Sequence, residues 1–187
     1  PGPPLGRGKS GSALHMNGTD GLSVGNLLPV FRQETGDYTV ASWVCFDRIE
    51  KQIIWSVGVV DNSAINTEAV KTSAYDRILW LNQNGQLEHT AYYPADKELG
   101  ARKAKPLVCN QALKPEVWYF IAVTHAKGKP KNLYLDGQLA AQNPALQEGR
   151  LERQCSLSLG QPFKGLGPGL VGSISEVLFF NRDLSEK

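Results

Sequence analysis

Apolar residues occupy both alternating faces of the run from Trp118 to Thr124. One face carries Trp118, Phe120 and Ala122, and the other carries Tyr119, Ile121 and Val123. A strand that is apolar on both faces is typical of the centre of a sheet that is covered on both sides. We therefore predict a central strand at this position, with the other strands of the fold arranged around it.

The stretch from Tyr38 to Phe46 is apolar on both faces in the same way. Its Trp43, like Trp118, is therefore expected to be mostly buried in the core. Nearer the start of the chain, Asn17–Gly21 separates two short strand patterns and is interpreted as the turn of a first hairpin.

Two dipeptides predict further hairpins. Asp136-Gly137 and Asn84-Gly85 each lie between apolar strand patterns and supply the residues that a tight turn needs. The last strand pattern is irregular. Its apolar residues alternate with polar ones, and this alternation shifts by one position between Ile174 and Val177. A β-bulge at Ser175–Glu176 is the simplest explanation of that shift.

Helix signals are nearly absent, since no stretch of useful length has a period of 3.6 residues. About a dozen short strand patterns separated by Gly, Asn, Asp and Pro are typical of a β-sandwich. The chain has 187 residues, which is an ordinary size for one sandwich domain. The sequence therefore predicts an all-β fold with two antiparallel sheets.

The order of a tryptophan, alternating apolar residues, a threonine, a basic loop and Leu-Tyr-Leu-Asp-Gly, over residues 118–137, resembles the laminin G-like, pentraxin-like group of concanavalin A-like jelly rolls. Three other stretches match the group in the expected order: 11–20, 38–44 and 171–185. The resemblance implies a jelly-roll β-sandwich over residues 11–187. Residues 1–10 are rich in Gly and Pro and are expected to be a flexible linker.

Composition and charge exclude several classes of partner. Hydrophobic residues make up 41% of the chain and charged residues 20%, which is the balance of an ordinary globular domain. The net charge is +2, and the densest basic run, Ala101–Lys105, has no interleaved aromatic residues, so we expect no nucleic-acid partner. The apolar runs are too short to cross a bilayer as helices, so we expect no membrane insertion.

No catalytic pattern occurs in the structural context that it needs. The glycosidases among the jelly rolls place their acids as Glu-x-Asp-x-x-Glu, and this spacing does not occur in the chain. Gly21–Gly25 matches the Gly-x-Ser-x-Gly pattern, but Ser23 lies within a short strand pattern and not on the strand-to-helix turn that presents a nucleophile, and the three histidines lie on separate strand patterns. We therefore predict that the domain is not an enzyme, with glycoside hydrolase as the least favoured of the functions considered.

The resemblance to pentraxins implies calcium ligands at two places, and only part of that set is found here. Asp76 fits the acidic position before the strand Ile78–Leu81, and Gln161 fits the start of the second group of ligands. The loop after Gln161 contains no carboxylate, whereas calcium takes six to eight oxygens with several charges among them. We expect no cofactor; if calcium binds, its ligands are Asp76 and Asp20.

Three cysteines, Cys45, Cys109 and Cys155, leave at least one thiol unpaired within the chain. The pentraxin branch has one disulfide, and the resemblance implies Cys45–Cys109 as its counterpart. Each cysteine lies in or beside a strand pattern, where a free cysteine behaves as a small hydrophobe. Both alternatives stay open from the sequence.

A carbohydrate site requires aromatic platforms beside hydrogen-bonding groups. Such residues gather on the Asn84-Gly85 hairpin, and we take four as candidate ligand-binding residues: Trp80, His89, Tyr92 and Tyr93. Alternatively, Trp80 packs in the core and the tyrosines are ordinary strand residues. The hairpin lies beside two long polar stretches, 61–74 and 94–105, and long loops on sandwiches tend to carry function.

The sequence and the resemblance together favour a non-catalytic recognition domain of a larger exported protein. It would bind carbohydrate or protein at the loop rim or on the concave face of the sandwich. Its location would be extracellular, at the cell surface or in the periplasm, beside neighbouring domains of the same chain. The alternative is a structural spacer or accessory domain without a ligand of its own.

Overall fold

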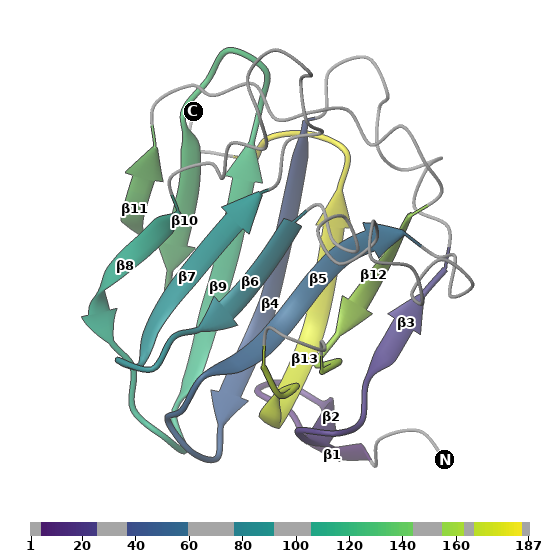
Figure 1. Cartoon of the computed structure of the whole chain (residues 1–187). Coiled ribbons are helices and arrows are strands. Elements are labelled where there is room, and N and C mark those ends of the chain that lie inside the picture. The colour runs from purple at the N-terminus through teal and green to yellow at the C-terminus, as the bar shows by residue number, and fades with distance from the viewer. Residues whose placement is uncertain are drawn as a thin grey trace, which may run out of the picture.

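The computed structural model describes residues 5–25, 37–59, 77–91, 106–143, 155–162 and 167–184, which consist of strands and their connections (Figure 1). Thirteen strands are found: β1 (Leu5–Arg7), β2 (Ser12–Asn17), β3 (Leu22–Val24), β4 (Tyr38–Phe46), β5 (Gln52–Val59), β6 (Arg77–Leu81), β7 (Gln86–Ala91), β8 (Leu107–Ala112), β9 (Trp118–His125), β10 (Lys131–Leu135), β11 (Gln138–Asn143), β12 (Cys155–Leu159) and β13 (Val171–Phe180). The described ranges contain no helix that is long and apolar enough to span a membrane.

The strands form two antiparallel sheets that face each other (Figure 1). A seven-stranded sheet has the order β1-β2-β13-β4-β9-β10-β11, and a six-stranded sheet has the order β3-β12-β5-β6-β7-β8. The predicted all-β sandwich is confirmed. Strand β9 lies between β4 and β10 inside the larger sheet, which is the central position that its two apolar faces predicted.

The core lies between the two sheets and is filled by alternate residues of their strands. The largest fully buried side chains include Trp55 on β5, Tyr38 and Phe46 on β4, and Met16 on β2. Because successive side chains of a strand point to opposite faces, the residues between these positions point away from the core.

The predicted irregularities of the backbone are present. The pairing of β13 with β4 shifts register between Ser175 and Leu178, and Glu176 has a φ of 51°, so the predicted bulge is confirmed. Asp136 and Gly137 have φ values of 50° and 80° and join β10 to β11. The Asn84-Gly85 turn joins β6 to β7, as predicted.

Two expectations near the start of the chain are wrong. Leu5–Arg7 lies within the stretch that we expected to be a linker, but it pairs with Ser12–Leu14 as the edge strand of the larger sheet. The turn Asn17–Gly21 does not close a hairpin, since β2 and β3 belong to different sheets. The chain changes sheets here, and the Gly18 N–H donates to the carbonyl of Leu170 at 2.8 Å, outside any hairpin ladder.

Candidate functional site

Aromatic side chains gather on the outer face of the seven-stranded sheet. On β4 and β9, Val44 and Ile121 belong to the core, so the alternate residues Trp43, Trp118 and Phe120 point to the other face. All three are only partly buried. The expectation that Trp43 and Trp118 lie in the core is therefore wrong, because they point to the outer face, where each is partly buried.

The register places these aromatic residues across three neighbouring strands. Trp43 pairs with Phe120, and their ring centroids are 5.3 Å apart at an interplanar angle of 53°. Trp118 lies opposite Cys45, and Tyr134 of β10 lies opposite Ala122. We call Trp43, Trp118, Phe120 and Tyr134 the aromatic strip.

Polar side chains lie beside the Trp118 end of the aromatic strip. One row of the sheet runs from Trp118 through Cys45 and Ser173 to His15. The Nδ1 atom of His15 is 3.1 Å from the hydroxyl of Ser173, and its Nε2 atom is 3.5 Å from a carboxylate oxygen of Asp47. The side chains of His15 and Asp47 are 45% and 46% exposed, so solvent and ligands have access to both.

The negative charges of two carboxylates, Asp47 and Glu116, act on Cys45. Partial burial raises the pKa of the Cys45 thiol, and the negative charges of Asp47 and Glu116 raise it further. Glu116 has a φ of 59°, an unusual conformation for a residue with a side chain, and its N–H donates to the carbonyl of Phe46 at 2.7 Å. Such backbone strain is often found beside functional sites.

Replacing Glu116 with glycine is expected to stabilise the domain by roughly 0.5–1 kcal/mol, because glycine adopts a positive φ without the cost that the Cβ atom imposes. The matched control is Glu116→Ala, which removes the same carboxylate but keeps the Cβ atom. Urea denaturation of the two variants measures the difference in the free energy of unfolding. Equal stability of the two would show that the Glu116 backbone is not strained.

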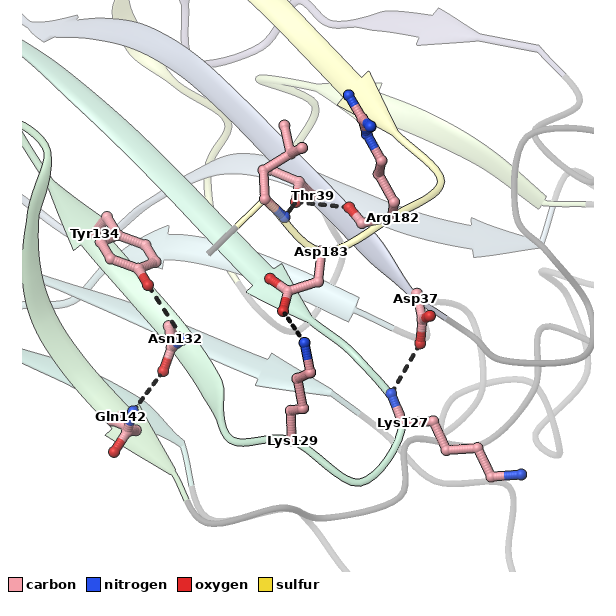
Figure 2. A network of polar contacts seen from close by, with 10 residues as sticks. Asp37, Thr39, Lys127, Lys129, Asn132, Tyr134, Gln142, Arg182 and Asp183 are labelled. Atoms are coloured by element: carbon pink, nitrogen blue, oxygen red, sulfur yellow. Dashed lines mark hydrogen bonds and ion pairs between the residues drawn. The ribbon is translucent and has the colours of Figure 1, made fainter. Parts of the chain in front are cut away.

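Hydrogen bonds fix the opposite end of the aromatic strip (Figure 2). The amide of Asn132 donates to the hydroxyl of Tyr134 at 3.2 Å, and the amide of Gln142 donates to the carbonyl oxygen of Asn132 at 2.9 Å. On β4, which β9 separates from β10, the hydroxyl of Thr39 donates to the carbonyl of Arg182 at 2.8 Å. These contacts hold Tyr134 in place and tie the segment after β13 to the sheet.

The four candidate residues on the Asn84-Gly85 hairpin do not all lie in the described ranges. Trp80 is on the outer face of the six-stranded sheet, where the Lys51 ammonium lies 5.2 Å from its ring centroid. His89 is 1% exposed and points into the core, with its ring 5.4 Å from that of Trp55. The structure therefore places Trp80 and His89 on opposite faces. Tyr92 and Tyr93 lie outside the described residues.

Of the two candidate calcium ligands, Asp76 and Asp20, the structure describes only Asp20. Asp76 lies outside the described residues. Asp20 lies in a turn in which the side-chain oxygen of Asn17 accepts hydrogen bonds from the N–H groups of Thr19 and Asp20. A Cβ atom on Gly21 would come within 2.6 Å of Gln161, so this turn packs closely against the second candidate region. It supplies one carboxylate, whereas calcium takes six to eight oxygens, and no group of three or more His, Cys, Asp or Glu is found in the described ranges.

Addition of EDTA is expected to change the melting temperature little. A tightly bound ion at about 1,000 times its dissociation constant would add roughly 4 kcal/mol of stability. For a chain of this size each kcal/mol moves the midpoint by about 2–4 °C, so differential scanning calorimetry detects such an ion. A fall of more than about 5 °C would contradict the expectation and make Asp76 the first ligand to replace.

The cysteine pairing that the pentraxin resemblance implies is not formed. Cys45 and Cys109 are both free thiols. Cys45 points to the outer face of the seven-stranded sheet, whereas Cys109 on β8 is buried in the core and belongs to the other sheet. Two side chains on different layers of the sandwich do not meet the short Cα separation of a disulfide.

The two packed antiparallel sheets define a jelly-roll β-sandwich. The chain belongs to the concanavalin A-like lectin/glucanase superfamily, whose laminin G model matches residues 17–187. No match was found among curated proteins.

Several solved structures share the fold. Domain 4 of AbnA, a GH43 extracellular arabinanase from Geobacillus stearothermophilus, in complex with arabinotriose, is 16% identical, with a TM-score of 0.67 over 97% of this chain and 76% of that chain. Mouse laminin alpha1 domains LG4-5 are 15% identical, with a TM-score of 0.65 over 98% of this chain and 44% of that chain. The SAP-like pentraxin of Limulus polyphemus is 14% identical, with a TM-score of 0.55 over 80% of this chain and 65% of that chain.

Proposed function

We propose that the domain is a non-catalytic recognition module of a larger exported protein, and that it binds carbohydrate on the outer face of the seven-stranded sheet. The observation that carries this proposal is the aromatic strip, in which four partly buried rings lie on one sheet face beside exposed polar groups. A sheet face that contacts only solvent gains nothing from two tryptophan side chains, so their presence on this face indicates a binding surface.

The chemistry of the face suits a sugar. A sugar ring has an apolar face that packs on an aromatic ring, and a rim of hydroxyl groups that need hydrogen-bond partners. Trp43 and Trp118 supply platforms on adjacent strands. His15, Asp47 and Glu116 lie at one end of the strip and supply donors and acceptors.

The same residues argue against catalysis. Glycoside hydrolysis needs one carboxyl group that is kept protonated by a desolvated site and a second that acts as nucleophile or base. Asp47 and Glu116 are both exposed to water, which does not provide such a site. We therefore propose binding without turnover.

The context of the proposal comes from the structures that share the fold. One is a domain of an extracellular arabinanase in complex with arabinotriose, and another belongs to laminin. Accordingly we propose an exported parent chain, with carbohydrate or protein as the ligand class and other domains of the same chain as neighbours. The alternative, a spacer domain without a ligand, predicts no binding in the experiment below.

Affinity gel electrophoresis tests the proposal with arabinan, xylan, laminarin and heparin as immobilised polysaccharides. We expect at least one of them to retard the wild-type domain, and we expect no release of reducing sugar on prolonged incubation. Migration unchanged in every gel would favour the spacer. Release of reducing sugar that disappears in Asp47→Asn or Glu116→Gln would contradict binding without turnover.

A further inference from the structure

The aromatic strip is longer than one sugar ring. Its ends are Trp118 on β9 and Tyr134 on β10, and Tyr134 lies opposite Ala122 of β9. At about 3.3 Å per residue along a strand and about 4.8 Å between strands, the backbone positions of Trp118 and Tyr134 are roughly 14 Å apart. Neighbouring rings that stack have centroids only about 4.5–7 Å apart. One sugar ring, which is about as large as an aromatic ring, therefore covers only part of the strip.

The middle of the aromatic strip joins its two ends. Trp43 and Phe120 form a cross-strand pair between the ends, and both rings are partly exposed. Ala122 follows Phe120 on the same face of β9 and lies beside Tyr134. Its methyl group is too short to cover the rings on either side of it. A ligand that lies along the strip therefore finds apolar surface over the whole distance from one end to the other.

Hydrogen-bonding groups lie at both ends of the aromatic strip. At the Tyr134 end, the exposed Gln142 donates its amide to Asn132, which in turn donates to the hydroxyl of Tyr134 (Figure 2). At the other end are His15 and Asp47, whose side chains are nearly half exposed. A ligand that contacts both ends therefore needs polar groups along its whole length. The hydroxyl groups of a glycan chain meet this need.

The end of the strip next to Cys45 is negative. Burial, and then the charges of Asp47 and Glu116, raise the pKa of the Cys45 thiol, and no cation is among the causes of that shift. Both carboxylates are exposed. The ammonium of Lys9 lies 5.3 Å from the ring centroid of Trp43, and the two carboxylates outnumber it. A negative potential repels the carboxylates and sulfates of acidic sugars, so uncharged sugars fit this end better.

We propose that the ligand is an extended chain of uncharged sugar units that lies lengthwise on the aromatic strip, with about three consecutive units in contact, an inference that rests on the proposed carbohydrate site. One unit packs at Trp118, the next on Trp43 and Phe120, and the third on Tyr134. Exposed side chains lie at both ends of the strip, so a longer chain can continue past it in either direction. The site thereby takes an internal stretch of a linear polysaccharide.

The affinity is expected to rise with chain length and then to level off. A monosaccharide covers one platform of the strip, whereas a trisaccharide reaches from Trp118 to Tyr134. We expect the trisaccharide to bind about tenfold or more tightly than the monosaccharide, because each added ring packs on a further aromatic side chain. The hexasaccharide is expected to gain little more, since its additional units lie beyond the strip.

NMR titrations that follow the indole N–H signals of Trp43 and Trp118 measure these affinities. The probes are arabino-, xylo- and laminari-oligosaccharides of one, three and six units, with trigalacturonate as the acidic counterpart. We expect saturable shifts of both signals with at least one uncharged series. Trigalacturonate is expected to bind at least about fivefold more weakly than the best uncharged trisaccharide, because the exposed carboxylates repel it.

Tyr134→Ala tests the position of the third unit. It removes the last platform, so we expect the ratio of the affinities for trisaccharide and monosaccharide to fall about threefold or more. Leu178→Ala is the matched control, because Leu178 is 44% exposed and lies in the same row of the sheet as Tyr134, on the far side of Ala41 and Ala122. We expect Leu178→Ala to keep the ratio of the wild type. The dispersed indole signals in the same spectra show that both variants are folded.

The outcomes separate the lengthwise chain from the carbohydrate site itself. If no sugar shifts Trp43 or Trp118, the site and the chain are both overturned. Saturable shifts with equal affinities for monosaccharide and trisaccharide would leave the site standing and overturn the chain. Tighter binding of trigalacturonate than of every uncharged trisaccharide would overturn the charge of the ligand, and an equal fall of the ratio in Tyr134→Ala and Leu178→Ala would overturn its orientation.

Discussion

Replacing Trp55 with alanine is expected to destabilise the domain by about 3–5 kcal/mol. Trp55 is 1% exposed and packs in the core between the sheets, so the truncation removes a large buried apolar surface and leaves a cavity. The melting temperature should fall by roughly 6–20 °C for a chain of this size. Urea denaturation followed by far-ultraviolet circular dichroism measures the loss.

Trp43→Ala is the matched control for Trp55→Ala. Trp43 is only partly buried on the outer face, so its truncation is expected to cost about 1–2 kcal/mol, including the loss of its contact with Phe120. A loss at Trp43 as large as that at Trp55 would mean that another layer covers the outer face of the seven-stranded sheet.

Carbohydrate binding is expected to weaken at least tenfold in Trp43→Ala and in Trp118→Ala. Each substitution removes a platform on which a sugar ring packs, and a central aromatic residue of a binding face typically contributes about 2 kcal/mol or more. A loss of that size corresponds to roughly 30-fold in affinity. Affinity gel electrophoresis with the polysaccharide that retards the wild type measures the effect.

Trp80→Ala is the control for these two variants. Trp80 is also partly buried on an outer face and lies under a lysine, as Trp43 does, but it belongs to the other sheet. We expect its truncation to leave carbohydrate binding unchanged. Loss of binding in Trp80→Ala alone would move the site to the Asn84-Gly85 hairpin.

Much of the architecture could be predicted because strand patterns and turn residues are local signals. The central place of β9 follows from its two apolar faces. The bulge at Glu176 follows from the shift by one position in the alternation of apolar residues along β13. The alternation of residues does not show which apolar face meets the partner sheet. For that reason Trp43 and Trp118 were expected in the core, although they lie on the outer face.

The candidate site was harder to predict, because its residues come from distant parts of the chain. His15 joins the row of Cys45 and Trp118 only through the pairing of β2 with β13 and of β13 with β4. For the hairpin, the register that decides the faces comes from the structure, in which Trp80 pairs with Glu88 across the Asn84-Gly85 turn. Since His89 is the next residue, it must lie on the face opposite to Trp80.

The measurement that tests the carbohydrate site most directly uses the four tryptophans of the chain as internal probes. Their indole N–H signals are followed by NMR while arabinotriose, or the oligosaccharide of the polysaccharide that retards the domain, is added. We predict saturable shifts of Trp43 and Trp118, with Trp55 in the core and Trp80 on the other sheet unchanged. Shifts of Trp80 with Trp43 and Trp118 unmoved would contradict the proposed binding face.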